Sequence, residues 1–79
     1  MKNLDKYNQA FIDTFSITDA ALKDLKYQEI TEWDSVGHMH LMSSLEEKFE
    51  IELEIDDIID FSSYSKGVEI LAKYNITLD

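Results

Sequence analysis

The fold is decided by the stretch Glu32-Trp33-Asp34-Ser35-Val36-Gly37-His38-Met39 and by the run that follows it to Phe49. At 3.6 residues per turn, this run has one broad apolar face and an opposite polar face. The apolar face holds Met39, Leu41, Met42, Leu45 and Phe49, and the polar face holds His40, Ser43, Ser44, Glu47 and Lys48. The pattern predicts an amphipathic helix from about Ser35 to Phe49.

Ser35 lies where this helix is expected to begin. Asp34 or Ser35 can be the N-cap, and an acid at Asp34 also suits the positive end of the helix dipole. Free backbone N–H groups at a helix start are a natural seat for a phosphate. A serine hydroxyl there could cap the helix, attack a substrate or carry a phosphoryl-linked group. Gly37, in the first turn, is expected to cost the helix roughly 1 kcal/mol relative to alanine.

A further helix is expected upstream, from Asn3 to about Phe15, with Asn3 as its candidate N-cap. Its apolar stripe consists of Leu4, Tyr7, Phe11 and Phe15. The connection from Ser16 to Glu32 is longer than the usual link between two helices. We expect it to lie across the helices and to insert its apolar side chains, which are Leu22, Leu25, Tyr27, Ile30 and the adjoining Trp33.

Downstream of Phe49, an extended loop is expected to lead to a short third helix over Asp56 to Asp60, with Ile58 and Ile59 facing inward. Ser62 or Ser63 then caps a fourth helix from Tyr64 to about Tyr74, and the residues from Asn75 to Asp79 are expected to fray. The sequence therefore predicts an all-α fold, a small four-helix bundle with a long first loop and a short third helix, in one domain over residues 1–79. The expected core residues are Phe11, Phe15, Leu41, Leu45, Phe49, Ile59, Val68 and Leu71.

The composition limits the classes of function. The net charge of −10 over 79 residues argues against nucleic-acid binding, which needs a basic surface, and favours partners with basic surfaces. The chain has no cysteine, shows no signal peptide and has no apolar run of transmembrane length. We therefore expect a cytoplasmic protein, monomeric and without membrane insertion.

Acidic residues gather between Glu46 and Asp60 with only Lys48 among them. This acidic stretch is either a solvated face or a docking surface for basic patches on partner enzymes. An EF-hand is rejected because the stretch lacks the loop glycine and the ligand spacing of such a site. No metal site is expected.

The motif around Ser35 resembles that of a known family. Asp34-Ser35-Val36, followed by Leu41, Leu45-Glu46-Glu47 and Phe49-Glu50-Ile51, is similar to the "Asp-Ser-Leu" and "Leu-Glu-x-x-Phe" pattern of the acyl carrier proteins and their peptidyl and D-alanyl carrier relatives. The resemblance covers about Leu4 to Tyr74 and is strongest from Trp33 to Ile51. It implies that Ser35 bears a covalent 4′-phosphopantetheine arm derived from coenzyme A.

The same resemblance implies a non-catalytic carrier that holds an acyl group as a thioester on the arm. Its partners would be a phosphopantetheinyl transferase and acyl- or aminoacyl-activating and transferring enzymes with basic docking patches. The residues expected to recognise partners are Asp34, Val36, His40, Glu46, Glu47 and Asp56. Many acyl carrier proteins have acidic residues at the positions of Gly37 and His40, so this chain favours a specialised biosynthetic pathway.

Alternative interpretations stay open at this point. The cargo could be an amino acid, as in D-alanyl and peptidyl carriers, or the chain could be an unmodified acidic helical adaptor. Trp33 is interpreted as a hydrophobic staple, with contact to the arm or a partner as the alternative. His38 is interpreted as a rim histidine bonded to backbone or water, with contact to the arm as the alternative. A hydrolase built on Ser35 and His38 is disfavoured, because neither an orienting acid nor an oxyanion hole can be identified.

Overall fold

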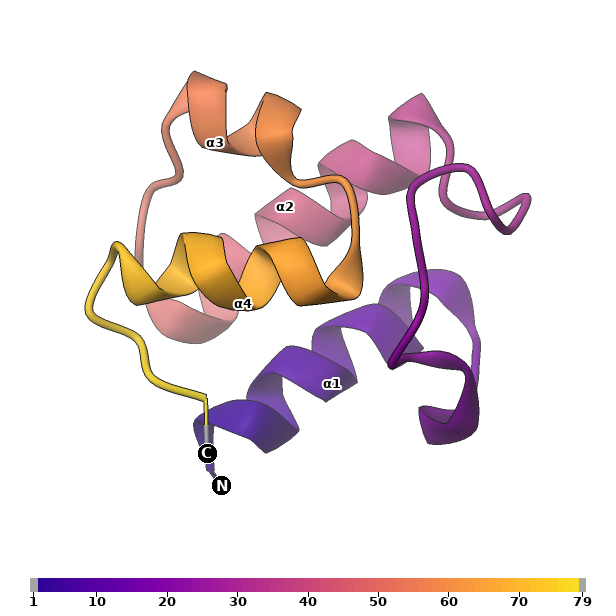
Figure 1. Cartoon of the computed structure of the whole chain (residues 1–79), viewed down its shortest axis with the longest axis horizontal. Coiled ribbons are helices and arrows are strands. Elements are labelled where there is room, and N and C mark those ends of the chain that lie inside the picture. The colour runs from indigo at the N-terminus through magenta and orange to yellow at the C-terminus, as the bar shows by residue number, and fades with distance from the viewer. Residues whose placement is uncertain (1, 79) are drawn as a thin grey trace.

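The computed structural model describes residues 2–78, and this range contains four α-helices, one 3₁₀ turn and no β-strand. The helices are α1 (Asn3–Phe15), α2 (Ser35–Phe49), α3 (Ile55–Asp60) and α4 (Tyr64–Ala72), and the 3₁₀ turn η1 covers Asp19–Ala21 (Figure 1). The expected all-helical class is confirmed. The bounds of α1 and α2 agree with those expected, whereas α3 begins one residue earlier than expected and α4 ends before Tyr74.

The start of α1 and the segment that follows α4 lie side by side (Figure 1). The expectation that Asn3 caps α1 is wrong, because the N-cap is Lys2. The Asn3 side chain instead donates a hydrogen bond to the Thr77 carbonyl oxygen at 3.2 Å. Ile76 is 9% exposed and its N–H donates to Leu71 O. The expectation of a frayed tail is therefore wrong for Asn75 to Leu78, while Asp79 lies outside the described residues.

The buried apolar side chains form one cluster, to which α1, α2, α4 and the long connection all contribute. Aromatic rings dominate its centre: Trp33 stacks on Phe15 at 5.3 Å between ring centroids and meets Phe11 edge-on at 5.6 Å. Leu22 and Leu25 are also buried, and Tyr27 and Ile30 are partly buried against the cluster. The prediction that the long connection inserts its apolar side chains is confirmed.

Helix α4 approaches the core closely at Gly67. A Cβ added there would lie under 3.0 Å from both the Tyr7 hydroxyl oxygen and the Phe61 ring, so only glycine fits without a shift. The N-cap of α4 is Ser63, whose Oγ accepts a hydrogen bond from Lys66 N at 3.0 Å. Tyr7 donates its hydroxyl proton to Tyr64 O at 2.6 Å, and burial raises the pKa of Tyr7. These contacts fix α4 against α1.

Helix α3 lies differently from expectation. Ile59 is 72% exposed and Ile55 is 74% exposed, so the placement of Ile59 in the core is wrong, and Ile58 is only partly buried. The inward position belongs to Asp57, which is 3% exposed. Residues two apart on a helix point about 200° from each other, so an inward Asp57 turns Ile59 outward.

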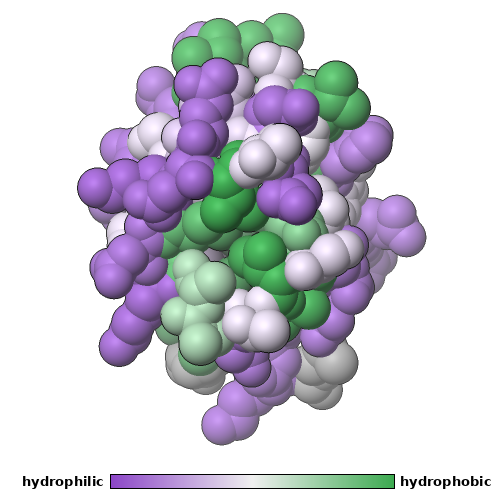
Figure 2. Space-filling model, turned by 90° about the vertical axis from the view of Figure 1, so that its right-hand side faces the viewer, coloured by the Kyte–Doolittle hydropathy of each residue, from purple (hydrophilic) through white to green (hydrophobic). Residues whose placement is uncertain are grey.

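The other expected core residues are divided between buried and partly buried positions. Phe11, Phe15, Leu41, Leu45 and Leu71 are buried, whereas Phe49 and Val68 are only partly buried. Met39, expected on the apolar face of α2, is 51% exposed. On the face that carries the long connection, Figure 2 shows apolar side chains gathered near the centre and surrounded by hydrophilic ones. None of the described helices is both long enough and apolar enough to cross a bilayer.

Candidate functional site

Ser35 is the first residue of α2 and is exposed to solvent. The N-cap is Asp34, whose carboxylate Oδ1 accepts a hydrogen bond from Gly37 N at 2.8 Å, while its carbonyl oxygen accepts from His38 N at 2.7 Å. The N–H groups of Ser35 and Val36 have no intrahelical acceptor, as is general for the first turn of a helix. The Ser35 hydroxyl therefore stands beside free donors at the positive end of the α2 dipole.

Gly37 fixes how the preceding loop meets this helix. A Cβ added at Gly37 would lie well under 3.0 Å from the Glu32 carbonyl oxygen and 3.3 Å from Phe15 Cε1. The backbone at Glu32 thus packs directly onto the first turn of α2. A residue with a side chain at position 37 would therefore force the Glu32 backbone or the helix to shift.

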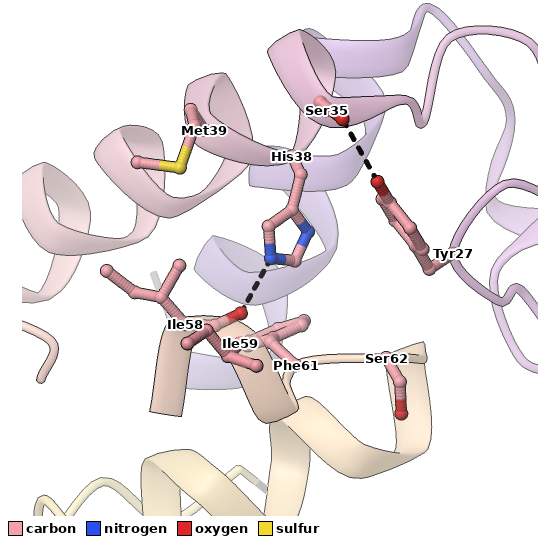
Figure 3. A pocket seen from close by; sticks show the side chains of 8 residues that line it. All are labelled: Tyr27, Ser35, His38, Met39, Ile58, Ile59, Phe61 and Ser62. Atoms are coloured by element: carbon pink, nitrogen blue, oxygen red, sulfur yellow. Dashed lines mark hydrogen bonds between the residues drawn. The ribbon is translucent and has the colours of Figure 1, made fainter. Parts of the chain in front are cut away.

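A groove of about 350 Å³ opens beside Ser35 between α2, α3 and the long connection (Figure 3). Its lining side chains are Tyr27, Ser35, His38, Met39, Ile58, Ile59, Phe61 and Ser62. Most of this lining is apolar, and Ser35 lies at one end of it (Figure 3). The exposed side chains of Val36 and Met39 on α2, and of Ile59 on α3, extend the apolar surface around the groove.

His38 lines the groove with both of its ring nitrogens engaged. The Trp33 indole Nε1–H donates to His38 Nδ1 at 2.9 Å, which makes Nδ1 an acceptor. The proton of the neutral ring is then on Nε2, which donates to the Ile58 carbonyl oxygen at 2.7 Å (Figure 3). The expectation of a rim histidine bonded to backbone is confirmed, and the ring offers Ser35 no free lone pair.

Trp33 is fully buried, with 0% exposure. It precedes the N-cap Asp34, and it stacks on His38, the fourth residue of α2, at 6.2 Å between ring centroids. This is the position pair of a hydrophobic staple, which fixes the angle at which the chain enters a helix. The expected packing of Trp33 at the helix entrance is confirmed, although its partner at the staple position is His38 and not an apolar residue. The indole presents no surface to an arm or a partner.

Tyr27 faces Ser35 from the other side of the groove. Its hydroxyl lies 3.3 Å from Ser35 Oγ, and either oxygen can be the donor (Figure 3). Sequence reasoning identified Tyr27 only as an anchor of the long connection. No sequence signal indicated this pairing, because it depends on how the connection folds back over eight residues.

The residues expected to recognise partners are distributed over the surface of α2 and the start of α3. Five of them are exposed, namely Asp34, Val36, His40, Glu47 and Asp56. Glu46 is only partly exposed, and its Oε2 accepts a hydrogen bond from Leu53 N at 2.8 Å. Glu46 therefore holds the loop between α2 and α3, and Glu47 presents the more accessible charge.

Asp57 belongs to the acidic stretch that the sequence predicts to be either a solvated face or a docking surface, but its side chain is buried. Its carboxylate forms an ion pair with Lys73 and accepts a hydrogen bond from the Tyr74 hydroxyl at 2.6 Å. The hydrogen bond from Lys73, followed by that from Tyr74, lowers the pKa of Asp57. The hydrogen bond between Lys73 and Asp57 also raises the pKa of Lys73. This cluster, together with the bond from His38 to Ile58, holds α3 over the groove.

Residues 2–78 contain no group of three or more histidine, cysteine, aspartate or glutamate side chains arranged to hold a metal ion. Comparisons with protein-family models, with curated proteins and with solved structures find no match to this chain.

Proposed function

We propose that this protein is an acyl carrier protein that bears 4′-phosphopantetheine on Ser35. The observation that carries the proposal is the exposed Ser35 hydroxyl, at the first residue of α2 and at the end of an apolar groove. The Asp34-Ser35-Val36 motif and the amphipathic helix behind it give the resemblance to the family. The chain also has four helices and a long connection between the first two, as the resemblance implies.

The residues around Ser35 suit a phosphodiester. The N–H groups of Ser35 and Val36 and the α2 dipole favour an anion next to Oγ. The Asp34 carboxylate is already bonded to Gly37 N through Oδ1, as the N-cap of α2. When bound, the arm supplies a terminal thiol that holds cargo as a thioester.

Attachment requires one displacement at phosphorus. Ser35 Oγ attacks the pantetheine-linked phosphorus of coenzyme A, so that an Oγ–P bond forms and the P–O bond of the anhydride breaks, with release of 3′,5′-ADP. The hydroxyl proton passes to a base on the transferase, because both nitrogens of His38 are engaged with Trp33 and Ile58. The chain thus supplies the nucleophile, Ser35 Oγ, and the transferase supplies the catalytic groups.

The groove and the charged surface support delivery of an acyl cargo. Met39, Ile58, Ile59 and Phe61 offer an apolar lining to a hydrocarbon chain. The net charge of −10 and the exposed Glu47 and Asp56 suit enzymes with basic docking patches. An aminoacyl cargo would make less use of this apolar lining.

The test is loading by a broad-specificity phosphopantetheinyl transferase with coenzyme A, followed by intact mass measurement. We expect one arm on the wild type and none on Ser35→Ala. Ser62→Ala is the matched control, because Ser62 lines the same groove and is not at a helix start. A wild type that takes no arm from several such transferases, or a Ser35→Ala variant that still takes one, would refute the proposal. The acidic-adaptor interpretation would then move to first place.

A further inference from the structure

We propose that Tyr27 is a positioning residue for the phosphodiester at Ser35, to which its hydroxyl donates a hydrogen bond. The inference rests on the proposed function and names a contact that the Ser35 motif does not contain. It begins from the 3.3 Å separation between the Tyr27 hydroxyl and Ser35 Oγ. That distance is longer than the 2.7–2.8 Å usual between two hydroxyls, so the pair is within reach without being tight.

The backbone around Tyr27 is held in place by the start of α4. Tyr27 N donates to Ser62 O at 2.9 Å, and Tyr64 N donates to Leu25 O at 2.9 Å. Between them, Lys26 and Ser63 form an isolated antiparallel bridge. A residue in an otherwise irregular connection is thereby fixed relative to the groove.

The Tyr27 ring is held as firmly as its backbone. It meets the His38 ring edge-on at 5.3 Å between centroids and the buried Trp33 ring edge-on at 6.3 Å. His38 is in turn fixed by Trp33 and by Ile58 O. The Tyr27 side chain is therefore already ordered with its hydroxyl beside Ser35. A hydrogen bond from it to the phosphodiester would cost little side-chain entropy.

Besides the N–H groups of Ser35 and Val36, the groove lining offers few donors to an anion at Ser35. No lysine or arginine is among its lining residues in the described part of the chain. The Nε2–H of His38 is committed to Ile58 O. The phosphorus of a phosphoryl group is bonded to Oγ, and its non-bridging oxygens lie two bonds from Oγ, within reach of a hydroxyl that already lies 3.3 Å from Oγ.

A neutral phenol is suited to this task because it donates strongly to an anion and adds no charge. The bond from Tyr27 would draw the phosphodiester to the side of Ser35 that faces the groove. The first atoms of the arm would then leave over the groove and not into open solvent.

The experiment compares Tyr27→Phe with the wild type, both loaded with phosphopantetheine at Ser35. The variant keeps the ring and removes only the hydroxyl. Tyr64→Phe is the matched control, because its hydroxyl donates to Asn8 on α1 and not to Ser35. The ³¹P resonance of the phosphodiester is expected to move in Tyr27→Phe and to stay in place in Tyr64→Phe.

Two further measurements test the contact between Tyr27 and the phosphodiester. In a double-mutant cycle, unfolding is measured for the wild type and Tyr27→Phe, each with and without the arm. Loading is expected to lower the unfolding equilibrium constant of the wild type by roughly three- to tenfold more than that of Tyr27→Phe. In wild-type protein labelled at tyrosine, the ¹³C resonance of Tyr27 Cζ should move on loading and that of Tyr64 should not.

The outcomes separate this inference from the proposed function. If the wild type is loaded but the ³¹P shift, the coupling and the Tyr27 Cζ shift are all unchanged, the Tyr27 contact is refuted and the carrier function stands. If the wild type takes no arm, the proposed function fails and this inference fails with it.

Discussion

Replacing Gly37 with alanine should destabilise the protein, although alanine is the better helix former. The substitution gains up to about 1 kcal/mol from helix propensity. Against this, the new Cβ would lie 3.1 Å from the Glu32 carbonyl carbon and well under 3.0 Å from its oxygen. The obstacle is backbone, which cannot rotate away as a flexible side chain can. Overpacking of this kind costs about 1–3 kcal/mol, and a clash with backbone belongs at the upper end of that range. After the gain from helix propensity is subtracted, we expect a net loss of about 2 kcal/mol.

Urea unfolding followed by helical circular dichroism measures this loss, with Ser43→Ala as the control. Ser43 is exposed on the same helix, so its replacement by alanine tests propensity alone and should leave stability within about 0.5 kcal/mol of wild type. In a domain of this size, 1 kcal/mol corresponds to a shift of about 4–8 °C in the melting temperature. A Gly37→Ala protein as stable as wild type, or more stable, would refute the packing argument for glycine.

Three further predictions concern the core, the α3 cluster and the acidic surface. Leu45→Ala, at a fully buried position, should cost about 2–5 kcal/mol in urea unfolding, and an unchanged midpoint would show that this face of α2 is not the core. Asp57→Asn should lower the melting temperature at pH 7. Because the pKa of Asp57 is lowered in the folded state, its contribution is present above the unfolded pKa near 4 and is lost as the pH falls through the folded value. The variant should therefore also show a smaller stability difference between pH 7 and pH 3, and the same pH dependence as wild type would contradict this role. Glu47→Lys should slow association with a transferase several-fold at low salt. Glu69→Lys, which makes the same change of charge at an exposed position on α4, should slow it less. Equal effects of the two variants would mean that only the net charge of the protein matters.

The long helices could be predicted because their signals are local. The apolar spacing in α1 and α2 extends over three to four turns, so both helices and most of their buried positions follow from the sequence. Met39 is an exception, because it was expected on the apolar face of α2 and is exposed. Helix α3 has six residues, which is fewer than two turns, and such a run does not define an inward face. The orientation of α3 is set instead by Lys73 and Tyr74, which lie 16 and 17 residues beyond Asp57.

In the candidate site as well, features set by neighbouring residues could be predicted from the sequence, and features set by distant segments could not. Asp34 as a cap and Ser35 at the helix start follow from residues within one turn of each other. The need for glycine at position 37 does not, because it arises from the Glu32 backbone folding onto the helix. The placement of Tyr27 depends on its hydrogen bond to Ser62 O across the groove, a contact between distant segments that no periodicity encodes.

The most direct test of the central claim is the mass of the Ser35-containing peptide from protein isolated from its native cells, without added transferase. A fraction of this peptide is expected to carry phosphopantetheine, free or acylated, and fragmentation should place the group on Ser35. Peptides containing Ser62 should be unmodified. A Ser35 peptide that is unmodified in all of the native protein would contradict the carrier function.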